Sequence, residues 1–482
     1  MTAKTPPLSQ KTRTSPASSS SQLEVRNPHN GKILARLKLA TGKEIHQAIQ
    51  SARSAFPKFR NWASFKRAEL LWKIHGRIKK EADSLARLIM NEAGKPISLA
   101  RGEVERTLQT FQTAAEEARR FGGDLIPLDL QPDSRGRIGL YRRFPIGPVL
   151  AITPFNFPLN LVAHKVAPAV AVGNTIILKP AEKTPLSALR LAEICREAGL
   201  PEGVLNEVVA SPETISTAVA DDRIKMLSFT GSVEIGWKLK ALSGKKKVAL
   251  ELGGNAAAIV DEDADLEPAA SRIARGAFAY AGQSCISVQR ILIHEKVYQP
   301  FIRFLTEATQ KEIKMGNPED PEVLVGPLIN EKTADRVEAW IEEAKQAGAK
   351  VLSGGRRFPG NFIEPTLLSN VRHDLSISCE EAFGPVALVE SVKDFDEGVQ
   401  AANDSRFGFQ CGVFTNTLDH VLQAYQELEM GGIIINDYPT YRTDPMPYGG
   451  VKDSGFGREG VRYAMEEMTE PKLLVLRKSR WD

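Results

Sequence analysis

The stretch YAGQSCISVQR, residues 280–290, contains the most reactive residue type in this chain of 482 residues. Cys285 is one of only four cysteines, and its neighbours are small and polar, whereas a cysteine in a protein core usually has apolar neighbours. A cysteine becomes nucleophilic when a helix N-terminus or a cation favours its thiolate. Cys285 is therefore either a packing residue or a nucleophile, and the other motifs of the sequence distinguish between these roles.

Two polar residues that could assist a nucleophile follow predicted strands. Asn156 lies in PFNFP after the apolar run VLAIT, and Glu251 lies in ELGG after KVAL. Ligands bind beyond the carboxyl ends of the strands in an open parallel sheet, so we expect these side chains to meet there. An amide can donate to an oxyanion, and a carboxylate can act as a general base toward a thioester. A Cys–His pair is poorly supported, because His164 is the only histidine in the motif segments.

Two further strand ends are candidates for binding a phosphate-containing cofactor. Lys179 and Glu182 lie in KPAE after TIIL, and Gly231 and Ser232 lie where FTGSVEIG passes from a strand into a helix. The backbone N–H groups of a helix N-terminus can hold a phosphate. Each motif is weak alone, since a GxxxxG stretch also fits an ordinary helix start and Lys-Pro often simply ends a strand.

The elements that must position these residues follow from the hydrophobic pattern. Helical periodicity predicts helices over 42–56, 63–93 and 97–120, and a helix that Thr184 caps and Pro185 begins. Strands and helices then alternate up to residue 251, which predicts a parallel sheet with crossover helices. The alternation restarts with NAAAIV, and a helix over 265–285 is expected to lead to the cysteine.

Composition excludes several classes of function. The net charge is +4 and the basic residues are scattered, so nucleic acid is not an expected partner. No run of about 20 apolar residues predicts a membrane span. The absence of CxxC pairs argues against structural zinc and any other metal, and for a reducing, cytoplasmic location. Cys195, Cys379 and Cys411 are expected to pack in the core.

The first 22 residues are rich in Ser, Thr and Pro and contain no acidic residue. This composition predicts a disordered tail. An organelle transit peptide shares the composition and remains the alternative, although such peptides usually carry more arginine.

Taken together, the motifs resemble those of the NAD(P)-dependent aldehyde dehydrogenase superfamily. The resemblance covers nearly everything after the N-terminal tail, in the family's order and at about its spacing. It rests on seven motifs: PFNFP, KPAEKTP, SFTGSVEIG, ELGG, GQSC, EEAFGPV and PYGGVKDSGFGREG. The chain departs from the common pattern at Phe155, where Trp is frequent, at Asn255, where Lys is frequent, and in VVASPETIS, which lacks glycines.

The resemblance implies a mechanism. Cys285 attacks the aldehyde carbon as a thiolate, and the Asn156 amide and the Cys285 backbone N–H hold the oxyanion. A hydride passes to the nicotinamide, and Glu251 activates the water that hydrolyses the thioester.

The resemblance also implies that NAD is the cofactor, with NADP possible, because a carboxylate beside the ribose disfavours a 2′-phosphate. The implied cofactor residues are Thr153, Pro154, Phe155, Lys179, Glu182, Gly231, Ser232, Gly236, Leu252, Glu381 and Phe383.

Motif details are most similar to the lactaldehyde and semialdehyde dehydrogenase-like branch, so we expect a small aldehyde that bears a hydroxyl or an anion. Arg442, Arg290 and Arg106 are the candidate cations, since a guanidinium suits a carboxylate, sulfonate or phosphate. Arg290 also occurs in members that act on neutral aldehydes. Arg106 lies on a predicted helix face, which favours a role in an ion pair.

Three rival functions remain. A CoA-acylating aldehyde dehydrogenase would transfer the thioester to CoA, but such enzymes commonly lack the base at Glu251. A catalytically idle binding protein on the same fold would not need Cys285, Asn156 and Glu251 together. A redox-sensing thiol protein would need a partner cysteine, which no spacing suggests.

The predicted fold is α/β. It has a Rossmann-like cofactor domain formed by residues 23–121 and 146–252 and an α/β catalytic domain formed by 253–462. By the same resemblance, residues 122–145 and 463–482 form a small β oligomerisation ribbon, and the expected assembly is a homodimer or homotetramer. An exposed edge strand such as PKLLVLRK needs another strand to pair with, in agreement with the expected assembly.

Overall fold

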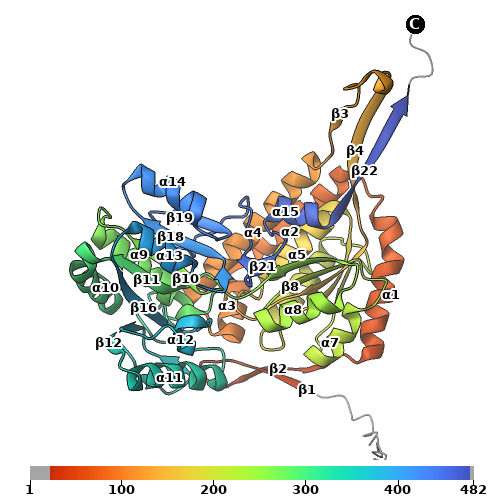
Figure 1. Ribbon diagram of the computed structural model, residues 1–482. Coiled ribbons are helices and arrows are strands. Elements are labelled where there is room, and N and C mark those ends of the chain that lie inside the picture. The colour runs from red at the N-terminus through yellow and green to blue at the C-terminus, as the bar shows by residue number, and fades with distance from the viewer. Residues whose placement is uncertain (1–21, 478–482) are drawn as a thin grey trace, which may run out of the picture.

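The computed structural model describes residues 22–477, which form two α/β lobes and a projecting β arm (Figure 1). The predicted tail lies outside the described residues except for Gln22, which begins a hairpin of β1 (Gln22–Arg26) and β2 (Ile33–Lys38). The predicted α/β class, with a Rossmann-like lobe, a second α/β lobe and a β ribbon, is confirmed.

The first lobe is built on a six-stranded sheet in the order β21-β9-β8-β5-β6-β7, in which only β21 is antiparallel to its neighbour. Its central strands are apolar and buried from end to end, as expected for parallel strands covered on both faces. The strands of this sheet are β5 (Pro148–Ile152), β6 (Thr175–Lys179), β7 (Leu205–Glu207), β8 (Met226–Thr230), β9 (Lys247–Glu251) and β21 (Gly455–Phe456).

Helices cover both faces of this sheet, and α5 is buried on every side because most of its residues are apolar, with Asn160, His164 and Lys165 as buried polar exceptions. The helices of this lobe are α1 (Gly42–Phe59), α2 (Ser64–Lys80), α3 (Ala82–Ala93), α4 (Ile97–Arg120), α5 (Asn160–Val172), α6 (Leu186–Glu197), α7 (Pro212–Val219), α8 (Val233–Leu242) and α15 (Val461–Glu467).

Two details of the sequence prediction are wrong here. The helix expected over 63–93 is divided at Glu81, whose backbone leaves the helical region with φ −105° and ψ 13°. Thr184 does not cap α6, because its hydroxyl donates to the carbonyl of Phe155. Instead the buried carboxylate of Glu92 accepts from the N–H groups of Leu186 and Ser187.

The second lobe has a seven-stranded sheet in the order β12-β15-β16-β11-β10-β18-β19, in which only β12 is antiparallel. Its strands are β10 (Ala256–Val260), β11 (Val288–His294), β12 (Lys350–Ser353), β15 (Thr366–Ser369), β16 (Val386–Val392), β18 (Gln410–Phe414) and β19 (Gly432–Ile435). Its helices are α9 (Leu266–Phe278), α10 (Tyr298–Glu312), α11 (Glu331–Gln346), α12 (Ser376–Cys379), α13 (Phe395–Asn403) and α14 (Leu418–Glu427).

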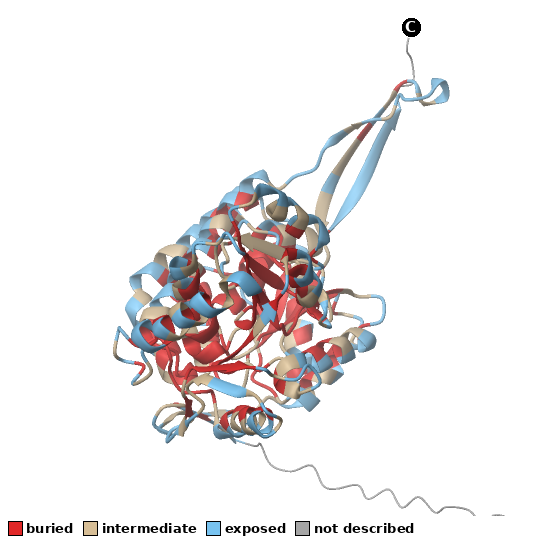
Figure 2. Ribbon diagram, turned by 60° about the vertical axis from the view of Figure 1, so that its left-hand side comes forward, coloured by how far each residue is buried: buried red, intermediate tan, exposed pale blue. Residues whose placement is uncertain are grey.

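Both sheets form the buried interior of their lobes, and helices and loops supply the surface (Figure 2). Two short antiparallel pairs complete the lobes: β13 (Arg357–Phe358) with β14 (Phe362–Ile363), and β17 (Phe407–Gly408) with β20 (Val451–Lys452). Cys195 and Cys411 are fully buried, but Cys379 is exposed on the last turn of α12 rather than packed in a core.

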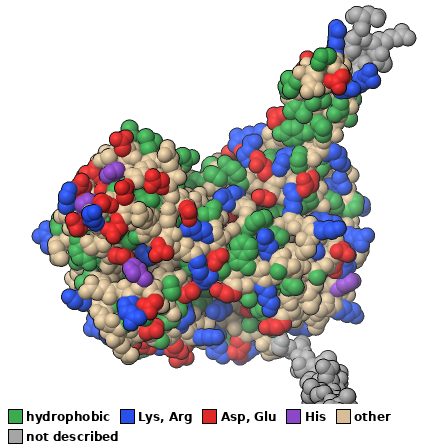
Figure 3. Space-filling model, viewed as in Figure 1, with side chains coloured by type: hydrophobic (Ala, Val, Ile, Leu, Met, Phe, Trp, Pro, Cys, Tyr) green, Lys and Arg blue, Asp and Glu red, His purple; other side chains and the backbone are tan. Residues whose placement is uncertain are grey.

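The arm is a three-stranded antiparallel sheet in the order β22-β4-β3. It consists of β3 (Leu125–Pro127), β4 (Arg137–Pro145) and β22 (Thr469–Arg477), and β22 pairs with β4 along its whole length. Apolar side chains gather along the arm, and Leu473 and Leu476 are about half exposed (Figure 3). The outer edge of β22 has no strand partner within residues 22–477.

Among the helices of residues 22–477, none combines the length and the apolar character that crossing a membrane requires.

Candidate active site

A cavity of about 620 Å³ lies between the two lobes, and most of the predicted site residues line it. Its walls come from α4, the loops after β5 and β9, the segment that carries Cys285, and the segment between β19 and α15. The predicted residues that the structure brings together here are Arg106, Pro154, Phe155, Asn156, Gly231, Ser232, Glu251, Leu252, Cys285, Glu381, Phe383 and Arg442.

The segment that carries Cys285 leaves the helix earlier than predicted. Helix α9 ends at Phe278 and a 3₁₀ turn follows, in which Tyr280, Ala281 and Gly282 all have positive φ. Gly282 is required there, because a Cβ would lie 2.1 Å from the carbonyl oxygen of Gly384.

The buried Gln283 side chain fixes this strained turn. Its Nε2 donates to the carbonyls of Tyr280 and Pro327, and its Oε1 accepts from the N–H of Ile329. Left-handed backbone at non-glycine residues persists only where the surroundings enforce it and is common at functional sites. The turn therefore holds Cys285 in one position at the cavity wall.

The Cys285 thiol lies in apolar surroundings beside Ile286, Phe409 and Tyr448. Burial raises the pKa of the thiol to about 12, and nearby Glu381 and Glu251 act in the same direction. A hydrogen bond to Tyr448 and the charge of Arg442 lower that pKa. The Cys285 Sγ lies 3.4 Å from the Tyr448 Oη.

Asn156 presents its amide at the same place. The side chain is 5% exposed, and its Nδ2 donates to the carbonyl of Gln283 across 3.0 Å. An amide nitrogen has two hydrogens, so this bond orients the group and leaves one N–H to donate elsewhere. The link to Gln283 ties Asn156 to the segment that carries Cys285.

Glu251 ends β9 and is 3% exposed, and its Oε2 has no hydrogen-bond partner among the described residues. Burial, followed by the neighbouring charge of Glu459, raises the pKa of Glu251 well above its usual value. Glu459 stays ionised because Lys165 and Arg442 hold its pKa low, with Lys165 Nζ at 2.8 Å. Glu251 is thus a carboxyl group with a raised pKa, as a general base near neutral pH requires.

Arg106 and Arg442 supply positive charge to the cavity. The Arg442 side chain is 5% exposed, lies 3.4 Å from Glu459, and stacks over the Tyr448 ring with its Cζ 3.5 Å from the centroid. Arg106 makes no ion pair with any residue between 22 and 477, contrary to the role that its helix face suggested. The Nε atoms of both arginines are buried, and neither has a hydrogen-bond partner among residues 22–477.

Arg290 was predicted as a substrate contact, and the structure does not bring it to the cavity. It lies on β11, is 8% exposed, and donates from its guanidinium to the Asn255 side chain and to the carbonyls of Ala401 and Ala402. These hydrogen bonds use the donors of the guanidinium and connect β11 to α13. The prediction of a substrate contact, which rested on the closeness of Arg290 to Cys285 in the sequence, is therefore wrong.

The predicted cofactor residues divide into two sets. Lys179, the last residue of β6, forms an ion pair of 2.9 Å with Glu182, and with Thr153 and Gly236 they lie outside the cavity lining. Ser232 is the N-cap of α8, and its side chain makes no capping bond, so the first N–H groups of the helix remain available.

Glu381 and Phe383 also line the cavity. Glu381 accepts from the Gly254 N–H at 3.0 Å, and burial raises its pKa to about 7. Phe383 packs edge-on against Phe155 with the ring centroids 5.7 Å apart. Ser232, Glu381 and Phe383 therefore line the cavity, whereas Lys179 and Glu182 lie beyond its lining.

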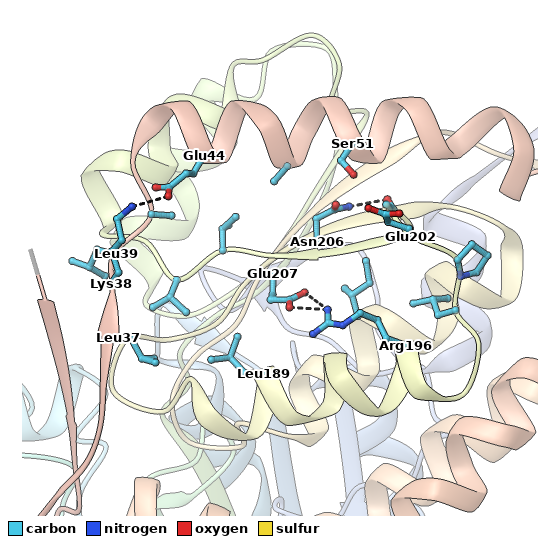
Figure 4. Close-up of a pocket in the computed structure, with 18 residues that line it drawn as sticks. Leu37, Lys38, Leu39, Glu44, Ser51, Leu189, Arg196, Glu202, Asn206 and Glu207 are labelled. Carbon is cyan, nitrogen blue, oxygen red and sulfur yellow. Dashed lines mark hydrogen bonds and ion pairs between the residues drawn. The ribbon is translucent and has the colours of Figure 1, made fainter. Parts of the chain in front are cut away.

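A second cavity, of about 810 Å³, lies between α1, α6 and the edge strand β7 (Figure 4). Four of its five charged residues form the ion pairs Lys38–Glu44 and Arg196–Glu207. None of the predicted catalytic residues lines it. Its size therefore does not make it the catalytic site.

Sequence reasoning missed several buried residues beside the predicted ones: Lys165, Asp444, Tyr448 and Glu459. Tyr448 and Glu459 belong to the motif PYGGVKDSGFGREG, which was recognised as a whole without assigning its side chains. Lys165 lies inside α5, where only its charge in an apolar run could have marked it. Within the described part of the chain, no group of three or more His, Cys, Asp or Glu side chains could hold a metal ion.

The model of the aldehyde dehydrogenase family matches residues 15–474. The chain is 43% identical over 456 residues to a 3-sulfolactaldehyde dehydrogenase of Priestia aryabhattai, covering 94% of this chain and 95% of that protein.

Two solved structures are similar over 95% of this chain. Aldehyde dehydrogenase 21 of Physcomitrella patens, in complex with the reaction product succinate, is 45% identical, with a TM-score of 0.93 over 95% of its own chain. The glyceraldehyde-3-phosphate dehydrogenase GapN of Methanocaldococcus jannaschii, complexed with NADP, is 39% identical, with a TM-score of 0.91 over 100% of its own chain.

Proposed function

The chain belongs to the aldehyde dehydrogenase family, and on that premise we propose that it oxidises a small anionic aldehyde to a carboxylic acid with NAD(P)+. The observation that carries the proposal is the convergence of Cys285, Asn156 and Glu251 on one cavity that also contains two arginines. A nucleophile, an oxyanion donor and a base are what acid formation through a thioester needs.

The thiolate of Cys285 adds to the aldehyde carbon, and the carbonyl oxygen takes the negative charge. The free N–H of the Asn156 amide and the backbone N–H of Cys285 donate to that oxygen. NAD(P)+, when bound, would supply the acceptor for the hydride, and the start of α8 with Lys179 and Glu182 would hold it. Glu251, in its carboxylate form, takes a proton from water as the water attacks the thioester, and the acid and the Cys285 thiol are released.

The residues present fit a dinucleotide. The free N–H groups at the start of α8 suit a pyrophosphate, and Lys179 with Glu182 suits the hydroxyls of a ribose. The buried hydroxyls of Thr153 and Thr230, which follow or end neighbouring strands β5 and β8, have no partner within residues 22–477, in agreement with a polar ligand at these strand ends. The carboxylate of Glu182 favours NAD+ over NADP+, because it repels a 2′-phosphate.

The substrate class follows from the arginines. The Arg106 guanidinium makes no ion pair among the described residues, with Asp444 acting on it only through its charge, and Arg442 has only a 3.4 Å contact with Glu459. Charged groups in a cavity are stable when a ligand of opposite charge pairs with them. The compounds named for the three relatives carry a sulfonate, carboxylates or a phosphate, and each is a small anion.

We also propose that the arm assembles the chain into a homodimer or homotetramer. The exposed apolar residues of β22 and its free edge support this, since exposed edges of this kind usually find a strand partner. Light scattering coupled to gel filtration tests the proposal. A dimer or tetramer that becomes a monomer when Leu474 and Leu476 are replaced by Asp supports it, and a monomeric wild-type protein contradicts it.

The main test is a panel of aldehydes in matched pairs with and without an anionic group, assayed with NAD+ and NADP+ at 340 nm. We expect kcat/KM to be at least about tenfold higher for the anionic member of each pair, since one charge-assisted hydrogen bond contributes more than about 1.4 kcal/mol. Higher activity on long apolar aldehydes contradicts the substrate class. Turnover that requires CoA and yields no free acid favours the CoA-acylating alternative instead.

A further inference from the structure

We propose that Tyr448 is a further catalytic residue, whose hydroxyl donates a hydrogen bond to the Cys285 sulfur and stabilises the thiolate. The inference rests on the proposed role of Cys285 as the nucleophile, and it adds the group that makes ionisation of the thiol to the thiolate easier. It starts from a contact between two side chains that are far apart in sequence, with the Cys285 Sγ and the Tyr448 Oη 3.4 Å apart.

The direction of this hydrogen bond changes with the state of the sulfur. Either atom can donate while the cysteine is a thiol. Once the sulfur is a thiolate, only the phenol has a hydrogen to give. Tyr448 is 3% exposed, and burial raises the pKa of its hydroxyl well above 10, so the phenol keeps its proton.

The need for such a donor follows from the groups around the sulfur. Burial raises the pKa of the thiol, and Glu381 and Glu251 disfavour the thiolate further. Arg442 and Tyr448 are the groups that favour the thiolate, and Tyr448 alone among the described residues donates directly to the sulfur. Apolar Ile286 and Phe409 complete the surroundings.

The packing of Tyr448 makes its hydroxyl a fixed donor. Arg442 covers one side of the ring at 3.5 Å from the centroid, and Phe409 contacts it with centroids 5.0 Å apart. The backbone on either side is held by reciprocal bonds between Tyr448 and Glu459, N–H to carbonyl in both directions. A preorganised donor that meets charge as it forms needs no rearrangement during the reaction.

The test is alkylation by iodoacetamide, in which the thiolate displaces iodide and forms an S–C bond. The rate at Cys285 is followed by mass spectrometry of its peptide between pH 7 and pH 9.5, in wild type and in Tyr448→Phe. We expect the phenylalanine variant to react about tenfold more slowly at each pH, because loss of a hydrogen bond to a charged group raises the thiol pKa by about one unit.

Three controls separate this effect from a change in structure. Exposed Cys379 of the same molecule reports reagent activity and must react at one rate in both proteins. Tyr425→Phe, at a site 75% exposed on α14, must leave Cys285 unaffected. 3-Fluorotyrosine at position 448, a stronger donor of nearly the same size, must react at least as fast as wild type.

A Tyr448→Phe protein that is alkylated at the wild-type rate, or a fluorotyrosine protein as slow as the phenylalanine variant, overturns the inference. A change in the KM for aldehyde alone, with unchanged alkylation, also overturns it, because Tyr448 would then only line the cavity. Failure of the proposed function is separate: it appears as a wild-type protein that forms no acid from any aldehyde, whatever its alkylation rates.

Discussion

Replacing Arg106 with Met removes a positive charge from the cavity while keeping a long flexible side chain. The residue lines the cavity from α4, has no ion-pair partner within residues 22–477, and has an unpartnered Nε. A hydrogen bond between a charged donor and an anion contributes about 1.5–3 kcal/mol, so its loss lowers kcat/KM for an anionic aldehyde by about 10- to 150-fold. If the guanidinium donates two hydrogen bonds to the anion, its removal lowers kcat/KM further.

The same substitution is expected to change little else. A neutral aldehyde of similar size makes no bond to the guanidinium, so its kcat/KM stays within about threefold of the wild-type value. The melting temperature is expected to fall only slightly, because Arg106 makes no ion pair among the described residues, although its charge lowers the pKa of the buried Asp444 carboxyl.

The assay measures NAD(P)H formation at 340 nm with an anionic aldehyde and its neutral counterpart. Arg119→Met serves as the matched control, since Arg119 is exposed at the far end of the same helix and outside the cavity lining. An Arg106→Met enzyme whose kcat/KM falls equally for both aldehydes would refute the reasoning. So would a variant that keeps full activity on the anionic aldehyde.

Three further results are expected. Glu251→Gln should leave one rapid burst of NAD(P)H and slow the following steady state by about 10²- to 10⁴-fold, because only thioester hydrolysis needs the base; equal loss of the burst contradicts this. In wild type, hydrolysis should rise with pH, since the raised pKa of Glu251 means that its carboxylate forms only at higher pH, and a stopped-flow profile that falls with pH argues against Glu251 as the base. Gly254→Ala should destabilise the protein by about 1–3 kcal/mol in thermal unfolding, because its Cβ would lie 2.1 Å from the Cys285 carbonyl oxygen; an unchanged melting temperature contradicts the packing seen here.

Much of the architecture could be predicted from the sequence because local signals and tertiary structure agree. Buried parallel strands are continuous apolar runs, and the polar residues that follow them meet where the strands end. The division of the 63–93 helix was not predictable from its pattern, because Glu81 is an ordinary helix former and no glycine or proline marks the break.

The catalytic candidates were found because their motifs are short and contiguous. The side chains that shift the pKa values of these candidates could not be found in the same way. Glu459, Lys165 and Tyr448 act across long sequence separations and reach their partners only in the folded chain. Arg290 shows the opposite error: it is close to Cys285 in sequence, but strand β11 directs its guanidinium toward α13.

The central claim is that Cys285 carries the acyl group, and its most direct test is peptide mass spectrometry of the Glu251→Gln enzyme quenched after mixing with an anionic aldehyde and NAD+. The account predicts one acyl adduct on the peptide that contains Cys285, formed in step with the burst of NADH and absent in a Cys285→Ala background. No adduct during a full burst, an adduct on another residue, or aldehyde oxidation that persists in Cys285→Ala would contradict it.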